Sequence, residues 1–320
     1  MFLKLFNTNR PTVLFLLAFI GVGLWLTSFL TVYIKVPNPS FIYFFLNETN
    51  VITGNIIAFT TILISGIMIS SFVNKSIYFN KINYLPAFFY VLLMSSMKEF
   101  SCHNPIIYAN LFLILAFGRL HLIYQQEKCK NHIFISSSYM FIATMFFFPY
   151  IVFLTLIWLV LFLIRPIVFK EWLMPFISFI VIGFNLYIIY CLFFENILFD
   201  YNFINTSIII TSIDSALSNY IISVIALISI ISIIALSKKY IQSVNRFKKL
   251  SLTTIYFLLI SITLSSYFYF ADLNNTSILI MAVPLSIILP FISYIRTKKW
   301  IYETLIFILV VLILANKLLL

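Results

Sequence analysis

Long uncharged apolar runs, separated by short polar turns, recur along the whole chain of 320 residues. The first run extends from Thr12 to Ile34 and meets no charge before Lys35, and about 20 such residues suffice for a helix to cross a bilayer. Because 63% of the residues are hydrophobic and 9% are charged, the composition excludes ordinary soluble domains and a nucleic-acid surface. We therefore predict a single integral membrane domain over residues 1–320, embedded in a lipid bilayer.

The apolar runs predict an all-α fold, a polytopic membrane helix bundle with about 11 transmembrane helices and no soluble domain. Backbone amides cannot stay unpaired in hydrocarbon, and the alternating pattern of barrel strands is absent, so each run must be helical. The predicted spans are Thr12–Ile34, Val51–Val73, Leu85–Met97, Ile106–Tyr124, Ile133–Phe148, Ile151–Phe169, Trp172–Phe194, Leu217–Leu236, Ser251–Phe270, Thr276–Ile295 and Ile301–Leu318.

Some segments depart from this simple pattern. Leu85–Met97 is short for a span, so it is predicted to be a tilted helix or a half-span. A single helix over 133–169 would be about 55 Å long at about 1.5 Å per residue, so Pro149 is predicted to separate two spans. The segment Ile197–Ala216 mixes acids and amides with Ile and Phe, which favours an interfacial or re-entrant piece on the outer face. Pro284 and Pro290 predict a kinked or broken helix.

Basic residues indicate how the chain is threaded. With the N-terminus in the cytoplasm, only Lys35, Lys98 and Lys317 of the 20 basic residues fall on the outer side. Cytoplasmic loops of membrane proteins carry an excess of Lys and Arg. The sequence therefore predicts a multi-pass protein of the cell inner (cytoplasmic) membrane, with its N-terminus cytoplasmic and its C-terminus outside.

Ionisable residues gather in two predicted outer segments. Glu48 ends the first outer loop, and the next outer turn brings Lys98, Glu99, His103 and Asn104 within seven positions. Such a cluster can supply general acid and base groups, so the candidate catalytic residues are Glu48, Glu99 and His103, and Lys98 and Asn104 are candidate substrate-binding residues. The alternative is a solvated turn with an exposed ion pair, worth under about 1 kcal/mol.

Two further candidates for substrate binding are Asp214 and Arg165. Asp214 is the acid predicted to lie closest to the membrane interior, where a carboxylate is a proton or cation site or else a charge at the interface. Arg165 opens a basic turn with Pro166 and Pro175 at its ends. This turn is interpreted either as an anchor to anionic headgroups or as a phosphate-binding site.

Other chemistries find less support in the sequence. No phosphate loop, nucleophile elbow or zinc-protease motif occurs, and no cofactor follows from the residues. The predicted positions of His103 (outside), His121 (buried) and His132 (inside) prevent them from sharing one metal, so no metal site is predicted. Arg119 and His121 are about 200° apart on a helix and are predicted to face different neighbours.

Short motifs resemble an uncharacterised family of polytopic inner-membrane proteins of Bacteroidota. They occur at 9–11, 85–87, 104–113, 147–150 and 165–175, and so are spread over most of the chain. The resemblance implies an inner-membrane bundle. Some members of that family carry the label of carotenoid cleavage oxygenase, which the placement of the three His in this sequence argues against, because such an iron centre needs several converging His.

The layout of many spans and short outer loops with acids is also similar to that of GT-C type polyprenyl-linked glycosyltransferases. In that class an acid of the first outer loop acts as general base or metal ligand, and Glu48 is the acid of that loop here. The paired-acid motif of the class and its large outer domain are missing.

Three functions stay open from the sequence. The first is a lipid-linked sugar transferase of cell-envelope assembly, acting on a polyprenyl-phosphate-linked substrate. The second is a transporter or flippase that uses the kinked span near Pro284 and the carboxylate of Asp214. The third is a noncatalytic subunit of an envelope machine.

Overall fold

The computed structural model describes residues 2–8, 10, 12–30, 51–76, 78–79, 81–97, 103–125, 129–193, 216–270, 277–294 and 299–318, and their regular structure is entirely helical. In these ranges 11 helices have ten residues or more, and each overlaps one predicted span, which confirms the all-α fold. They are α2 (Thr12–Leu30), α4 (Val51–Lys75), α5 (Leu85–Met94), α6 (Pro105–Leu122), α7 (Lys130–Phe146), α8 (Leu154–Ile164), α10 (Met174–Phe193), α11 (Ala216–Gln242), α12 (Asn245–Phe270), α13 (Ser277–Ile288) and α14 (Lys299–Leu318).

Shorter pieces complete the described architecture. They are the helical turns α1 (Phe2–Phe6) and α9 (Phe169–Trp172) and the 3-10 segments η2 (Ile123–Gln125), η3 (Phe148–Phe153) and η6 (Leu289–Tyr294). Within the described ranges, six of the helices are long and apolar enough to cross a membrane, and further apolar helices are shorter. The chain is thus a multi-pass membrane protein.

The short helix α5 occupies the interior of the bundle. All ten of its residues are buried, and it packs against α4 and α13. Pro86 stands in its first turn, where a missing amide hydrogen costs nothing. A helix too short to span hydrocarbon is tolerated there because surrounding protein, rather than lipid, covers its ends.

Proline residues lie where the helical pattern changes, between two predicted spans and within a third, as expected. After α7 ends at Phe146, Pro149 lies in η3 and α8 follows, so the hairpin contains two helices. Pro284 lies inside α13, which passes into η6 at Leu289 before Pro290. The hydroxyl of Ser232 on α11 donates to the carbonyl of Leu289 at 3.2 Å.

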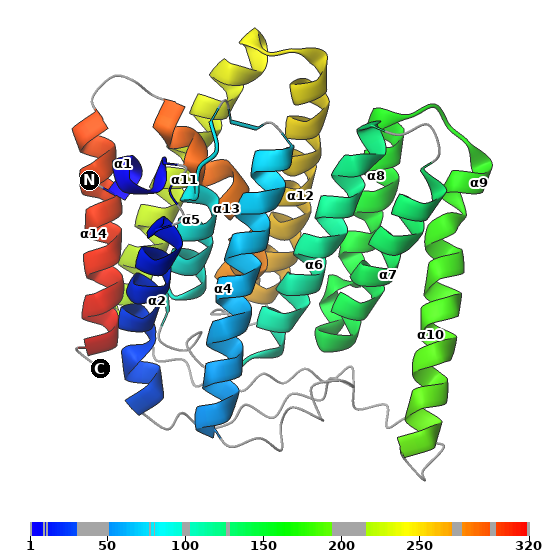
Figure 1. Cartoon of the computed structure of the whole chain (residues 1–320), viewed down its shortest axis with the longest axis horizontal. Coiled ribbons are helices and arrows are strands. Elements are labelled where there is room, and N and C mark those ends of the chain that lie inside the picture. Colours follow the sequence, from blue (N-terminus) through cyan, green and yellow to red (C-terminus); the bar gives the residue numbers. More distant parts are fainter. Residues whose placement is uncertain are drawn as a thin grey trace.

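Successive long helices run in alternating directions (Figure 1). The helices α4, α6, α8, α11 and α13 all end on the upper side of that view, where the N-terminus also lies, and the C-terminus lies on the lower side. We call the upper side the basic end, because Lys75, Arg119, Arg165 and Lys239 lie in or beside its turns, and the lower side the opposite end. That the basic end faces the cytoplasm remains a prediction.

One of the three basic residues that the sequence assigns to the outer side lies in a helix and is buried. Lys317 is buried near the end of α14, and its Nζ donates to the backbone carbonyl of Leu24 on α2 at 2.5 Å. The contact joins the last helix to the first long one. A buried ammonium needs such a partner, because leaving it unpaired in hydrocarbon is expensive.

Candidate functional site

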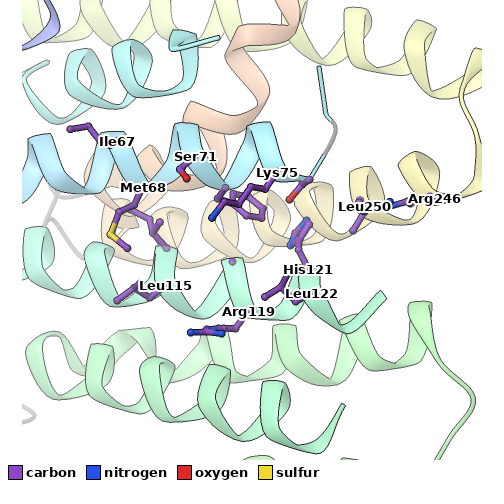
Figure 2. A pocket seen from close by; sticks show the side chains of 14 residues that line it. Ile67, Met68, Ser71, Lys75, Leu115, Arg119, His121, Leu122, Arg246 and Leu250 are labelled. Atoms are coloured by element: carbon purple, nitrogen blue, oxygen red, sulfur yellow. The ribbon is translucent and has the colours of Figure 1, made fainter. Parts of the chain in front are cut away.

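A cleft of about 590 Å³ opens between α4, α6 and α12 near the basic end. Figure 2 shows the side chains that line it, with Arg246 at one extreme and Met68 and Leu115 at the other. The lining residues are Ile67, Met68, Ser71, Phe72, Lys75, Ser76, Ile114, Leu115, Gly118, Arg119, His121, Leu122, Arg246 and Leu250. We call the part of the lining that carries Lys75, Arg119 and Arg246 its basic mouth, and the part that carries Met68 and Leu115 its apolar floor.

The mouth carries one cation from each of three helices. Lys75 is the last residue of α4, Arg119 is in the last turn of α6 and Arg246 is in the first turn of α12. Among the residues that the structure describes, none of the three pairs with a carboxylate, and the buried Nε of Arg246 has no hydrogen-bond partner. A site with three such cations is suited to a multiply charged anion.

The start of α12 strengthens this field. Its first five residues include Arg246, Lys248 and Lys249 and no acidic residue. The N-terminus of a helix is already the positive end of its dipole, so cations there are unfavourable unless an anion is near. The helix dipole and the basic side chains thus both favour a negatively charged ligand.

The floor of the cleft is apolar and reaches the exposed surface of the bundle. Met68 and Leu115 line it, and Ile67 is 41% exposed on the outer surface of the bundle. From Lys75 to Ile67 the cleft follows α4 for about 12 Å, at about 1.5 Å per residue. Gly118 leaves room at the centre, since a Cβ there would come no closer than 3.8 Å to the ring of Phe72. An alkyl chain can lie along this floor while its head group meets the cations.

His121 forms the inner wall of the cleft. Its Nδ1 lies 3.1 Å from the carbonyl oxygen of Phe117, and its Nε2 lies 2.8 Å from the hydroxyl of Tyr78. The same hydroxyl donates to the carbonyl of Leu250 on α12 at 2.9 Å. Burial raises the pKa of Tyr78 well above its ordinary range, so this phenol stays protonated and keeps its donor. The sequence interpretation that Arg119 and His121 serve different neighbours is therefore incomplete, because both line one cleft.

The segment that carries Tyr78 is held in place by Lys239 of α11. The ammonium of Lys239 donates to the backbone carbonyl of Tyr78 and, at 2.6 Å, to the hydroxyl of Tyr294. It also lies over the rings of Phe247 and Tyr294, 4.7 and 4.0 Å from their centroids. This cage of aromatic groups joins α11, α12, η6 and the inner wall of the cleft.

The opposite end of α6 carries two of the predicted site residues. Asn104 is the N-cap of α6, and its side-chain oxygen accepts from the amide of Ile106 at 3.0 Å. The backbone amide of His103 donates to the side chain of Asn55 on α4 at 3.0 Å, and its Nδ1 lies 2.9 Å from the hydroxyl of Tyr108. Asn104 thus has a structural task, and the ring of His103 is half-buried beside Tyr108.

Arg165 lies in an ion pair with a neighbour of its own turn. Its Nη1 is 3.0 Å from Oε1 of Glu171, and both side chains are largely covered. The indole of Trp158 donates to the carbonyl of Trp172 at 3.3 Å, which closes the same turn. Pairing with Glu171 offsets the charge that a phosphate at Arg165 would need.

Four predicted site residues, Glu48, Lys98, Glu99 and Asp214, lie outside the described residues, and so does the segment Ile197–Ala216. The predicted approach of Glu48 to the turn at Lys98 stays a prediction. In the part of the chain that the structure describes, no three His, Cys, Asp or Glu side chains gather as a metal site would require.

The cleft itself was not predicted from the sequence. In the sequence Lys75, Arg119 and Arg246 are topology signals of the cytoplasmic side, and only the packing of three helices brings them into the lining of one cleft. One local signal was available, because the run from Arg246 to Lys249 places three cations at a helix start without an acid. Comparison with known proteins adds nothing to this geometry, since no protein-family model, no curated protein and no solved structure matches the chain.

Proposed function

We propose that this membrane protein binds a phosphate-headed lipid of the polyprenyl class in the basic cleft, as a step of cell-envelope assembly in the inner membrane. The observation that carries the proposal is the cleft's polarity, with Lys75, Arg119 and Arg246 at its mouth and an apolar floor open to the bilayer. A free phosphate would leave the apolar floor without a contact, and an uncharged lipid would leave the cations of the mouth without a counter-charge.

The charge at the mouth favours a phosphate monoester or diphosphate over an ordinary phospholipid. A phosphate monoester carries about −1.5 to −2 charge at pH 7, whereas a phospholipid diester carries a single negative charge. Three cations from three helices match the higher charge better, because among the described residues none of them pairs with a carboxylate. A linear isoprenoid chain also matches the apolar side chains of the floor.

The lead role for such a protein is a lipid-linked sugar transferase, with Glu48, Glu99 and His103 as its candidate catalytic residues on the predicted outer face. The cleft and His103 lie at opposite ends of α6, about 24 Å apart at about 1.5 Å per residue. A phosphate bound in the cleft is therefore out of reach of His103. A transferase would need either movement of that lipid or a second donor molecule.

The alternative role is a flippase or transporter, in which the cleft loads the lipid and the protein moves its head group across. The change of α13 to 3-10 geometry at Leu289, five residues after Pro284, favours this role, because interrupted helices line many transport pathways. Asn110 and Tyr150, whose side chains are 2.7 Å apart in the core beside α13, add buried polar groups there. A noncatalytic subunit would use the cleft only for lipid contact.

Binding is tested first, with the purified protein in nanodiscs of phosphatidylcholine. Farnesyl phosphate is titrated, and bound lipid is read by native mass spectrometry. We expect Arg119→Gln together with Arg246→Gln to weaken binding at least about 100-fold, as the loss of two charge-assisted contacts at about 1.4 kcal/mol per tenfold implies. Gly118→Leu, which fills the floor and leaves the charges intact, should weaken binding as well.

The controls separate the parts of the ligand. Lys170→Gln removes an exposed cation from the same end of the molecule but outside the cleft, and should bind like the unaltered protein. Farnesol tests the chain alone and inorganic phosphate tests the head group alone, and both should bind poorly. Equal binding of farnesyl phosphate and phosphatidylglycerol would reduce the site to a general anionic-lipid contact, and unchanged binding in the double variant would refute the proposal.

Complementation of a deletion strain separates the roles, with membrane levels of each variant measured alongside. A transferase should lose function in Glu48→Gln and Glu99→Gln, because the amide keeps the size of the side chain and removes its basicity. A cation-coupled transporter should lose function in Asp214→Asn instead. A noncatalytic subunit should tolerate all three changes.

A further inference from the structure

The helix α10 stands at the edge of the molecule, on the right of Figure 1. It packs on α7, where the hydroxyls of Ser178 and Ser138 lie 3.0 Å apart and the rings of Phe179 and Phe141 are 4.6 Å apart between centroids. Only 17% of the span Phe169–Ile188 is buried, the lowest share among the six candidate spans of the described residues. Most of the surface of α10 therefore faces away from its own chain.

This exposed surface contains an amide near the middle of α10. Asn185 lies about 17 Å beyond the start of α10, at about 1.5 Å per residue, which is close to half of a hydrocarbon core about 30 Å thick. The Nδ2 of Asn185 donates to the carbonyl of Val181 at 2.7 Å. Within the part of the chain that the structure describes, its Oδ1 accepts no hydrogen bond. Lipid tails cannot supply the missing donor.

We propose that α10 is the contact surface of a homodimer, in which Asn185 pairs with Asn185 of the partner subunit. A two-fold axis beside α10 brings each residue near its own copy. A primary amide has both donors and acceptors, so two copies of it satisfy each other, whereas a hydrophobic partner helix would satisfy neither. The exposed neighbours Phe184, Ile188 and Leu192 supply apolar packing around the pair. The proposal is independent of the lipid-binding function.

Dimerisation is tested in liposomes, by energy transfer between copies of the full chain that carry donor and acceptor labels on an N-terminal tag. The protein-to-lipid ratio is lowered stepwise until energy transfer is lost. Interhelical hydrogen bonds in membranes are worth about 1–2 kcal/mol in model peptides. Asn185→Leu should therefore need an about 10-fold higher protein-to-lipid ratio for the same energy transfer, and Asn185→Gln, which keeps an amide, should lie close to the unaltered protein.

The matched control is Asn219→Leu, which removes an exposed amide near the start of α11. It should leave the dilution curve unchanged, because α11 lies outside the proposed interface. Leucine at position 185 should not disturb folding, since that side chain is exposed on the surface of its own chain. Energy transfer no greater than that of a monomeric membrane protein at every ratio would overturn the proposal. So would a curve for Asn185→Leu that superimposes on that of the unaltered chain.

Discussion

The helices α6 and α10 are almost equally apolar, yet they occupy opposite environments. The span Pro105–Leu122 has a mean hydropathy of 1.5 and is 67% buried, whereas the span Phe169–Ile188 has a mean hydropathy of 1.6 and is 17% buried. Hydropathy reports that both segments enter the membrane. It does not report what covers them there, because lipid tails are as apolar as the side chains of a protein core.

Polar side chains separate the two helices where hydropathy does not. Asn110 of α6 is fully buried, accepts from the hydroxyl of Tyr150 at 2.7 Å and donates to the carbonyl of Leu279 on α13 at 3.0 Å. Asn185 of α10 is exposed and bonds only within its own helix among the described residues. The amide of Asn110 joins elements of the chain's own core, whereas that of Asn185 is exposed and is proposed to bind a partner subunit.

The largest effect is expected from Asn110→Leu. The change leaves the hydroxyl of Tyr150 and the carbonyl of Leu279 without this partner in the core, at about 1–3 kcal/mol for each buried group. We expect a loss of about 3 kcal/mol, measured as the free energy of unfolding in mixed micelles with increasing dodecyl sulfate. Asn185→Leu is the matched change on α10, and it should leave the stability of the monomer unchanged. Equal losses in the two variants would contradict the comparison.

Two adjacent lysines of α11 extend the comparison to charged groups. Lys239 is held by Tyr78 and Tyr294 and by aromatic rings, and Lys238 is exposed. Lys239→Met keeps the length of the side chain but loses a charge-assisted hydrogen bond and cation–π contacts, which is worth about 2 kcal/mol. The unfolding measurement should register this loss, whereas Lys238→Met should stay within about 0.5 kcal/mol, as for other exposed substitutions. A Lys238 variant as unstable as the Lys239 variant would refute the anchoring role.

Much of the fold could be predicted from the sequence, because lipid forces every buried backbone amide into a helix. The short interior helix at 85–94, the break at Pro149 and the interruption near Pro290 each follow from a local signal of length or proline. The order of helices around α5 could not be predicted in this way. Apolar stretches of equal hydropathy are interchangeable as partners until their side chains are packed.

The candidate site was predictable to a smaller extent, for a related reason. Lys75, Arg119 and Arg246 come to line one cleft only after three helices have packed, so a linear sequence presents them as separate topology signals. Asn104 is a residue for which the sequence supports two interpretations. Its position before Pro105 and an apolar run is a typical helix start, but its density of polar neighbours favoured a binding site. His103 remains a candidate, beside acids that lie outside the described residues.

A smaller effect is expected from Asn104→Ala at the start of α6. The side chain of Asn104 caps the helix through the amide of Ile106, and replacing such a cap with Ala costs about 1 kcal/mol. Asn104→Ser and Asn104→Asp keep a capping oxygen and should recover most of the stability. If Asn104 instead binds substrate, the Asp variant should complement a deletion strain poorly in spite of normal membrane levels, because it adds a negative charge where an amide was required.

The smallest effect is expected where α10 meets α7. Ser178→Ala removes the hydroxyl contact with Ser138, and double-mutant cycles put such an interhelical bond in a membrane protein at about 0.6 kcal/mol. The double variant Ser138→Ala with Ser178→Ala, compared with both single variants, isolates the coupling energy of the pair. The comparison is needed because the hydroxyl of Ser138 also contacts its own helix. A coupling energy near about 0.6 kcal/mol would mean that α10 is held to its own chain weakly by polar contacts. A coupling above about 2 kcal/mol, beyond the largest such values, would make α10 an integral part of the core in spite of its exposure. The difference between α6 and α10 would then lie in the surface they cover and not in how firmly they are attached.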